Sequence, residues 1–174
     1  MIKRHSPSPA GALNTAIPSS VVDDSVWDIL ERLDDIVQHE TKLFPNDTNL
    51  TCTLTALATA NTFSAWAEIE DNTGGTTLKL STAFATIAGH IEGLILESVS
   101  QDDTIYEVEI AYGSDKGIVT RWRFAGATKF INASHQIEAK GAHIPAGETV
   151  YYRMKTATVV ADTAVVHFRY FNHS

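Results

Sequence analysis

The sequence contains a single cysteine, Cys52, among its 174 residues. No disulfide can form within the chain, so the fold depends on its core and its hydrogen bonds. Cys52 lies in the segment 50–56, where threonines alternate with apolar residues. We therefore predict that Cys52 is a small buried apolar side chain.

Positive charge is also scarce, because 13 Lys and Arg face 21 Asp and Glu, for a formal net charge of −8 at pH 7. Surfaces that bind nucleic acids are usually basic, since they have to neutralise phosphates. We therefore expect no nucleic acid among the partners of this protein.

Long apolar runs are missing. No window approaches the roughly 18 apolar residues of a membrane span, so we expect no membrane partner. Lys3 and Arg4 give the N-terminus a basic character, but no apolar core follows them. This pattern does not predict a secretory signal.

Catalytic motifs are missing as well. The sequence has no Gly-x-Ser-x-Gly, no phosphate-cradling glycine loop and no His-Glu-x-x-His. We expect a protein that is not an enzyme, with no catalytic residue and no cofactor.

The seven histidines do not follow the spacing of a metal site. His135 and His143 are eight residues apart, and His167 and His173 are six apart, with no Cys or carboxylate in register. We predict no metal site within one chain and interpret these side chains as solvated or edge residues. A site with one histidine per subunit on a symmetry axis is a second hypothesis.

Acidic residues gather at two predicted turns, Glu68, Glu70 and Asp71 at one and Asp102 and Asp103 at the other. Two functions are conceivable for such groups, a Ca²⁺ site or paired carboxylates for glycoside hydrolysis. Neither group follows an EF-hand loop, and acidic turns beside strands are ordinarily solvated. We favour the solvated interpretation.

The sequence does contain a two-residue period, which is typical of β-strands. A turn signal over 144–148 precedes a predicted strand over 149–155 and a last strand over 164–171. One face of the last strand consists of Ala164, Val166, Phe168 and Tyr170.

The same period recurs upstream. Further strands are predicted over residues 50–56, 63–69, 77–80, 84–89, 91–96, 106–112, 118–124, 130–131 and 136–140. Short strands joined by Gly, Asp and Asn turns predict an antiparallel β-sandwich or jelly roll over residues 48–174. We expect its core to include Leu54, Ile110, Val166 and Phe168.

An aromatic platform is one candidate binding surface. Trp66, Trp122 and Tyr106, with Arg121 and Arg123 beside Trp122, could stack on a sugar. Alternatively, Trp122 faces the core of the sandwich and the two arginines lie on the opposite face of the strand. We favour the core position.

Two segments precede the predicted sandwich. Residues 1–22 are rich in Ser, Pro, Ala and Thr and have no period. They are either a disordered tail or a flexible arm that orders along a neighbouring subunit. Residues 23–45 predict an amphipathic α-helix that is capped near Ser25 and ends before Pro45.

The helix offers an apolar surface that has to cover something. Its predicted interface with another copy or with a partner consists of Val26, Ile29, Leu30, Leu33, Ile36 and Val37. The helix either packs on the β domain of its own chain or pairs with copies of itself as a short parallel coiled coil. Leu33 at an a-like position, with Ile29 and Ile36 at d-like ones, favours three or more strands.

The run 144–153, Ile-Pro-Ala-Gly-Glu-Thr-Val-Tyr-Tyr-Arg, is similar to the pattern Ile-Pro-Ala-Gly-x-x-Val-x-x-Arg of some phage structural proteins. With its arm, helix and β domain, the chain resembles small jelly-roll virion proteins of tailed bacteriophages. The resemblance implies a head decoration or cement protein in the virion, assembled in the host cytoplasm. Its partners would be further copies, with a trimer favoured, and major capsid or other virion proteins. The alternatives are a neck, tail or fibre component and a carbohydrate-binding β-sandwich module.

Overall fold

The computed structural model of the protein describes residues 41–73, 77–126, 130–138 and 141–173. Within these residues the protein is mainly β, with nine strands and one 3₁₀ helix, η1. In chain order they are β1 Lys42–Phe44, β2 Cys52–Thr55, β3 Ala67–Glu68, η1 Leu80–Phe84, β4 Gly89–Val99, β5 Thr104–Tyr112, β6 Gly117–Gly126, β7 Phe130–Glu138, β8 Val150–Thr156 and β9 Thr163–Asn172.

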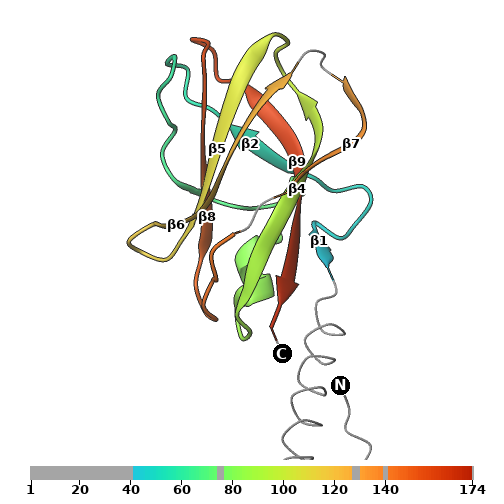
Figure 1. Ribbon diagram of the computed structural model, residues 1–174, viewed down its shortest axis with the longest axis vertical. Coiled ribbons are helices and arrows are strands. Elements are labelled where there is room, and N and C mark those ends of the chain that lie inside the picture. Colours follow the sequence, from blue (N-terminus) through green and yellow to red (C-terminus); the bar gives the residue numbers. More distant parts are fainter. Residues whose placement is uncertain (1–40, 74–76, 127–129, 139–140, 174) are drawn as a thin grey trace, which may run out of the picture. The chain divides into compact units, whose positions relative to one another are not determined.

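The strands form two antiparallel sheets that pack face to face as a sandwich (Figure 1). In the first sheet, called sheet A, β9 lies between β4 and the short strands β1 and β2, and β4 also pairs with β7. In the second, called sheet B, the order is β3-β8-β5-β6. The predicted antiparallel sandwich is therefore confirmed.

The pairs are nested along the chain. β5 pairs with β6, β4 with β7, β3 with β8 and β2 with β9, all of them antiparallel. Two further ladders, β4 with β9 and β5 with β8, connect these nested pairs side by side. The chain therefore runs as one long hairpin that is folded over into two layers.

The core lies between the two sheets. All four predicted core residues, Leu54, Ile110, Val166 and Phe168, are at most 1% exposed, which confirms this prediction. Trp122 of β6 lies across from Phe168 of β9, with ring centroids 6.3 Å apart. Buried and half-buried residues alternate along β8 and along β9 as far as Phe168, which matches the two-residue period in the sequence.

Several strands differ from their predicted extent. Residues 84–89 do not form a strand, because η1 ends at Phe84 and places both Leu80 and Phe84 in the core. The predicted strand over 63–69 shrinks to β3. Phe63 and Trp66 both contact Arg153, so they lie on the same side of the chain and the two-residue alternation fails.

Two other predicted pieces change in kind. Residues 77–80 make only an isolated bridge, between Lys79 and Glu70, instead of a strand. Of the two short strands predicted over 130–131 and 136–140, residues 130–131 and 136–138 belong to the single strand β7, and residues 139–140 lie outside the described residues.

The helix predicted over 23–45 is wrong at its C-terminal end. Lys42–Phe44 form β1, in which Phe44 pairs with Phe168 of β9 and is 8% exposed. Burial of Phe44 against the sheet and the proline that follows it both oppose a helical conformation there. The arm over 1–22 and the rest of the predicted helix, up to residue 40, lie outside the described residues.

The turn before β8 is attached to the sandwich at Gly89. The backbone amide and carbonyl of Ile144 exchange hydrogen bonds with those of Gly89, at 2.8 and 3.0 Å. A Cβ atom on Gly89 would lie 2.1 Å from the carbonyl oxygen of Phe171, too close for any side chain. Only glycine allows β4 to begin this close to the end of β9.

We predict that Gly89→Ala lowers the free energy of unfolding by about 2 kcal/mol or more, because the backbone of β9 has to move. The control is Gly117→Ala, whose new Cβ would meet the ring of Tyr112 at an ordinary 3.5 Å. Urea unfolding monitored by circular dichroism measures both variants. Equal small losses would contradict the close approach of β4 and β9.

Cys52 is fully buried, as predicted. Burial raises the pKa of its thiol far above the ordinary value of 9.0. Burial likewise raises the pKa of Tyr106 and of Tyr152 above 10.0. The folded state therefore holds these three groups in their neutral forms at a pH where the unfolded chain ionises them.

We predict a loss of stability in alkali. In the unfolded chain the Cys52 thiol ionises around pH 9 and the two tyrosines around pH 10, whereas the folded protein retains all three protons. Stability is therefore full below these values and is lost as the pH rises through each of them. The free energy of unfolding should fall by about 1.4 kcal/mol per pH unit for each group. Cys52→Ala should abolish the fall between pH 9 and 10 and leave the later fall due to the tyrosines. Identical pH profiles of the two proteins would contradict this account.

Candidate functional site

The outer face of sheet B carries two rows of charged side chains across β6, β5 and β8. The register places Glu109 between Arg121 and Arg153. Two residues away along each strand, the register places Glu107 between Arg123 and Lys155. Each row therefore has a carboxylate on the central strand and a cation on each side.

Glu109 is the centre of the first row. Although it lies on the outer face, its side chain is fully buried. Arg153 donates to Glu109 Oε2 at 2.5 Å, and Arg121 donates to Glu109 Oε1. Two cations thus neutralise a carboxylate that would otherwise be costly to remove from water.

Aromatic side chains cover part of this face. The guanidinium of Arg153 lies 4.4 Å from the ring centroids of both Phe63 and Trp66, within the range of a cation–π contact. The backbone amide of Ser64 donates to the carbonyl of Met154 at 2.9 Å. This bond holds the segment before β3 alongside β8, with its aromatic residues over the first row.

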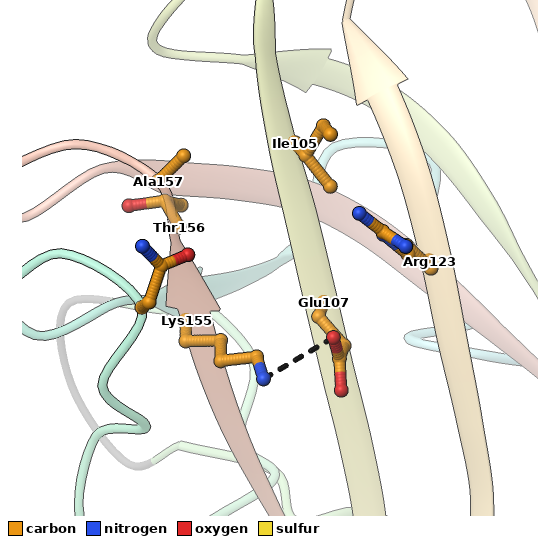
Figure 2. A pocket seen from close by; sticks show the side chains of 7 residues that line it. Ile105, Glu107, Arg123, Lys155, Thr156 and Ala157 are labelled. Atoms are coloured by element: carbon orange, nitrogen blue, oxygen red, sulfur yellow. Dashed lines mark ion pairs between the residues drawn. The ribbon is translucent and has the colours of Figure 1, made fainter.

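The second row is open and borders a pocket of about 210 Å³. Its polar and apolar walls include Asn61, Ile105, Glu107, Arg123, Lys155 and Thr156. Figure 2 shows Arg123 and Ile105 on one side of the pocket and Lys155 and Thr156 on the other. The backbone amide of Asn61 donates to the carbonyl of Thr156 at 2.7 Å and fixes Asn61 at the rim.

The cations of the second row differ in their pairing. Lys155 Nζ lies 3.3 Å from Glu107 Oε2. Arg121 of the first row also reaches Glu107, with its Nε 3.5 Å from Oε1. Among the described residues, Arg123 has no ion pair or hydrogen bond. Its exposed guanidinium is therefore available to a ligand of the pocket.

The two rows make this face locally positive. Their four cationic side chains and two carboxylates sum to a net charge of +2 for the two rows, whereas the chain as a whole carries −8. A small anion that approaches the acidic protein is drawn to this face.

The predicted aromatic platform is not assembled. Trp122 is 4% exposed and Tyr106 is fully buried, so both rings lie in the core, and Trp66 lies on the outer face. This outcome agrees with the alternative that placed Arg121 and Arg123 opposite Trp122. The sequence analysis missed that Arg123 faces a pocket, because Asn61 and Thr156 come from segments far away in the sequence.

The structure brings together three histidines that lie far apart in the sequence. Ring centroids of His90, His143 and His173 lie 4.8–5.4 Å apart, beside the ring of Phe171. No three His, Cys, Asp or Glu residues in the described part of the chain are arranged to hold a metal ion. His167 is elsewhere, 2.7 Å from Glu97 Oε1, and the side chain of His135 lies outside the description.

The acidic side chains of residues 68–71 form ion pairs and hydrogen bonds with other residues of the same chain. Lys79 Nζ lies 2.5 Å from Glu68 and 3.1 Å from Glu70, and these hydrogen bonds raise the pKa of Lys79. Asp71 is 5% exposed, and its Oδ1 accepts hydrogen bonds from the backbone amides of Thr73 and Leu78. The carboxylates there brace a turn.

The predicted interface residues of the helix, Val26, Ile29, Leu30, Leu33, Ile36 and Val37, lie outside the described residues. Among the residues that are described, no helix is both long and apolar enough to cross a membrane. No family model, curated protein or solved structure matches the chain.

We predict that Glu109→Gln lowers the free energy of unfolding by roughly 2–3 kcal/mol, because two arginines lose their shared counter-ion. Loss of one partner from a fully buried pair costs about 3–5 kcal/mol, and here both arginines reach water. Glu97→Gln is the control and should cost below about 1 kcal/mol, because Glu97, which pairs with His167, is itself exposed. Chemical denaturation of both variants measures the difference, and equal effects would refute the role of Glu109.

Proposed function

We propose that this protein is a non-enzymatic structural component of a tailed-phage virion, a head decoration or cement protein that acts as a homotrimer. The observation that carries the proposal is the nested order of the strands. Sheets of order β2-β9-β4-β7 and β3-β8-β5-β6 follow from folding one long hairpin across itself. This is the layout of a jelly roll, a fold that recurs in viral capsid proteins.

The run that resembles phage structural proteins supports the proposal through the fold. Four of the six fixed positions of its pattern have a structural role that the described residues show. Ile144 and Val150 are fully buried, Gly147 has a φ of +82°, and Arg153 pairs with Glu109. These roles belong to the turn before β8 and to β8 itself. What the run shares with phage structural proteins therefore concerns the fold.

The described residues also give the sandwich one end suited to attachment. The chain enters the sandwich at β1, where Lys42 pairs with Tyr170, two residues before β9 ends (Figure 1). The start of β1 and the end of β9 therefore lie at the same end of the sandwich. In the proposed assembly, the segment that precedes β1 attaches this end to a shell.

Oligomerisation explains the apolar surface of the predicted helix. Three copies would bury Val26, Ile29, Leu33 and Ile36 around an axis. A trimer of this kind fits local three-fold positions of an icosahedral shell, where three weak arm contacts combine through multivalency.

We predict that replacing Ile29 and Leu33 with Asp converts the trimer into a monomer and abolishes binding to heads that lack the protein. The sandwich should keep its far-ultraviolet circular dichroism, because its core lies within residues 41–173. Sedimentation velocity measures the mass of the full chain, and co-sedimentation with purified heads measures binding.

The control places Asp at Arg32 and Gln38, which the apolar repeat leaves out. This variant should stay trimeric and bind heads. A wild-type protein that is monomeric at high concentration and binds no head would overturn the proposal.

A further inference from the structure

The pocket on sheet B has the composition of a site for a small organic acid with hydroxyl groups. We propose that it binds the carboxylate-bearing sugar residue of an acidic glycan, with Arg123 as the anchor. This inference does not depend on the virion role, because it rests only on described residues of the sandwich.

Arg123 supplies the contact for the carboxylate. The guanidinium is exposed at the wall of the pocket and has no partner among the described residues. Its planar fork matches the two oxygens of a carboxylate, and a charge-assisted pair of this geometry is strong and directional. The neighbouring cation, Lys155, adds to the positive potential although it already pairs with Glu107.

The other walls select a sugar in preference to a bare inorganic anion. Glu107 borders the pocket and can accept hydrogen bonds from the hydroxyl groups of a sugar, which sulfate lacks. Its charge opposes every anion, but it opposes the doubly charged sulfate more than a single carboxylate. Asn61 and Thr156 add an amide and a hydroxyl at the rim. Ile105, which is 41% exposed, offers an apolar surface to the C–H face of a sugar ring.

The size of the pocket limits the ligand to about one residue. Its volume of about 210 Å³ lies below the roughly 300–1,000 Å³ of sites for drug-sized molecules. The pocket is open to solvent, so a longer glycan could extend beyond it while its acidic residue stays at Arg123 (Figure 2).

The experiment titrates the full chain with glucuronate, N-acetylneuraminate, glucose and sulfate, followed by nuclear magnetic resonance of the backbone amides. We expect one of the two acids to shift amides of Ile105, Glu107 and Thr156, and the tighter acid identifies the class of sugar. Glucose and sulfate should bind at least about tenfold more weakly, because each lacks part of the recognised chemistry.

Variants test the role of Arg123 directly. Arg123→Gln should weaken binding of the preferred acid at least about tenfold, and Arg123→Lys should fall between it and the wild type. Lys42→Gln, on sheet A, removes the same charge outside the pocket and should leave the affinity unchanged. The proposal is overturned if neither acid binds, if sulfate binds as tightly as the acids, or if Arg123→Gln binds normally.

Discussion

The pairing of β4 with β9 is the interaction on which the rest of the structure depends. The ladder extends from Gly89, opposite Asn172, to Val99, opposite Ala164. It joins the outermost nested pair, β2 with β9, to the pair formed by β4 and β7. Without this ladder sheet A would separate into two parts, β9 with β1 and β2, and β4 with β7, and the core at Phe168 would lose one of its sides. The close approach at Gly89 and the bridge to Ile144 follow from it, because both lie where β4 begins beside the end of β9.

Sheet B combines two roles on its two faces. Its inner face closes the core with Tyr106, Val108 and Ile110 of β5, which are fully buried. Its outer face alternates with these residues and carries the charged rows at Glu107 and Glu109. One row is neutralised and covered by aromatic rings, whereas the other borders the pocket with Arg123 unpaired. One face of β5 thus contributes to the core, and its other face borders the pocket.

Local patterns predicted much of the fold and little of the site. Alternation along 106–112 and 164–171 identified the faces of β5 and β9, because a strand repeats every two residues. Local patterns could not predict the order of the strands. Residues 89–99 pair with residues 163–172, but neither segment has a sequence feature that identifies the other as its partner. For the same reason the histidines at 90, 143 and 173 and the pocket at Arg123 were missed. The prediction at Phe44 was wrong because an apolar side chain there fits a helical repeat and a strand equally well. Pairing with Phe168 of β9 makes this residue part of a strand.

The two proposals assign different parts of the chain to different partners, the N-terminal segment to a shell and the outer face of sheet B to a glycan. The central claim is assembly, and electron cryo-microscopy of heads that carry the protein tests it most directly. The account predicts three copies around local three-fold axes, with the end of each sandwich at Lys42 and Asn172 towards the shell. Density for the protein at the neck, tail or fibres alone, or single copies without three-fold contacts, would contradict it.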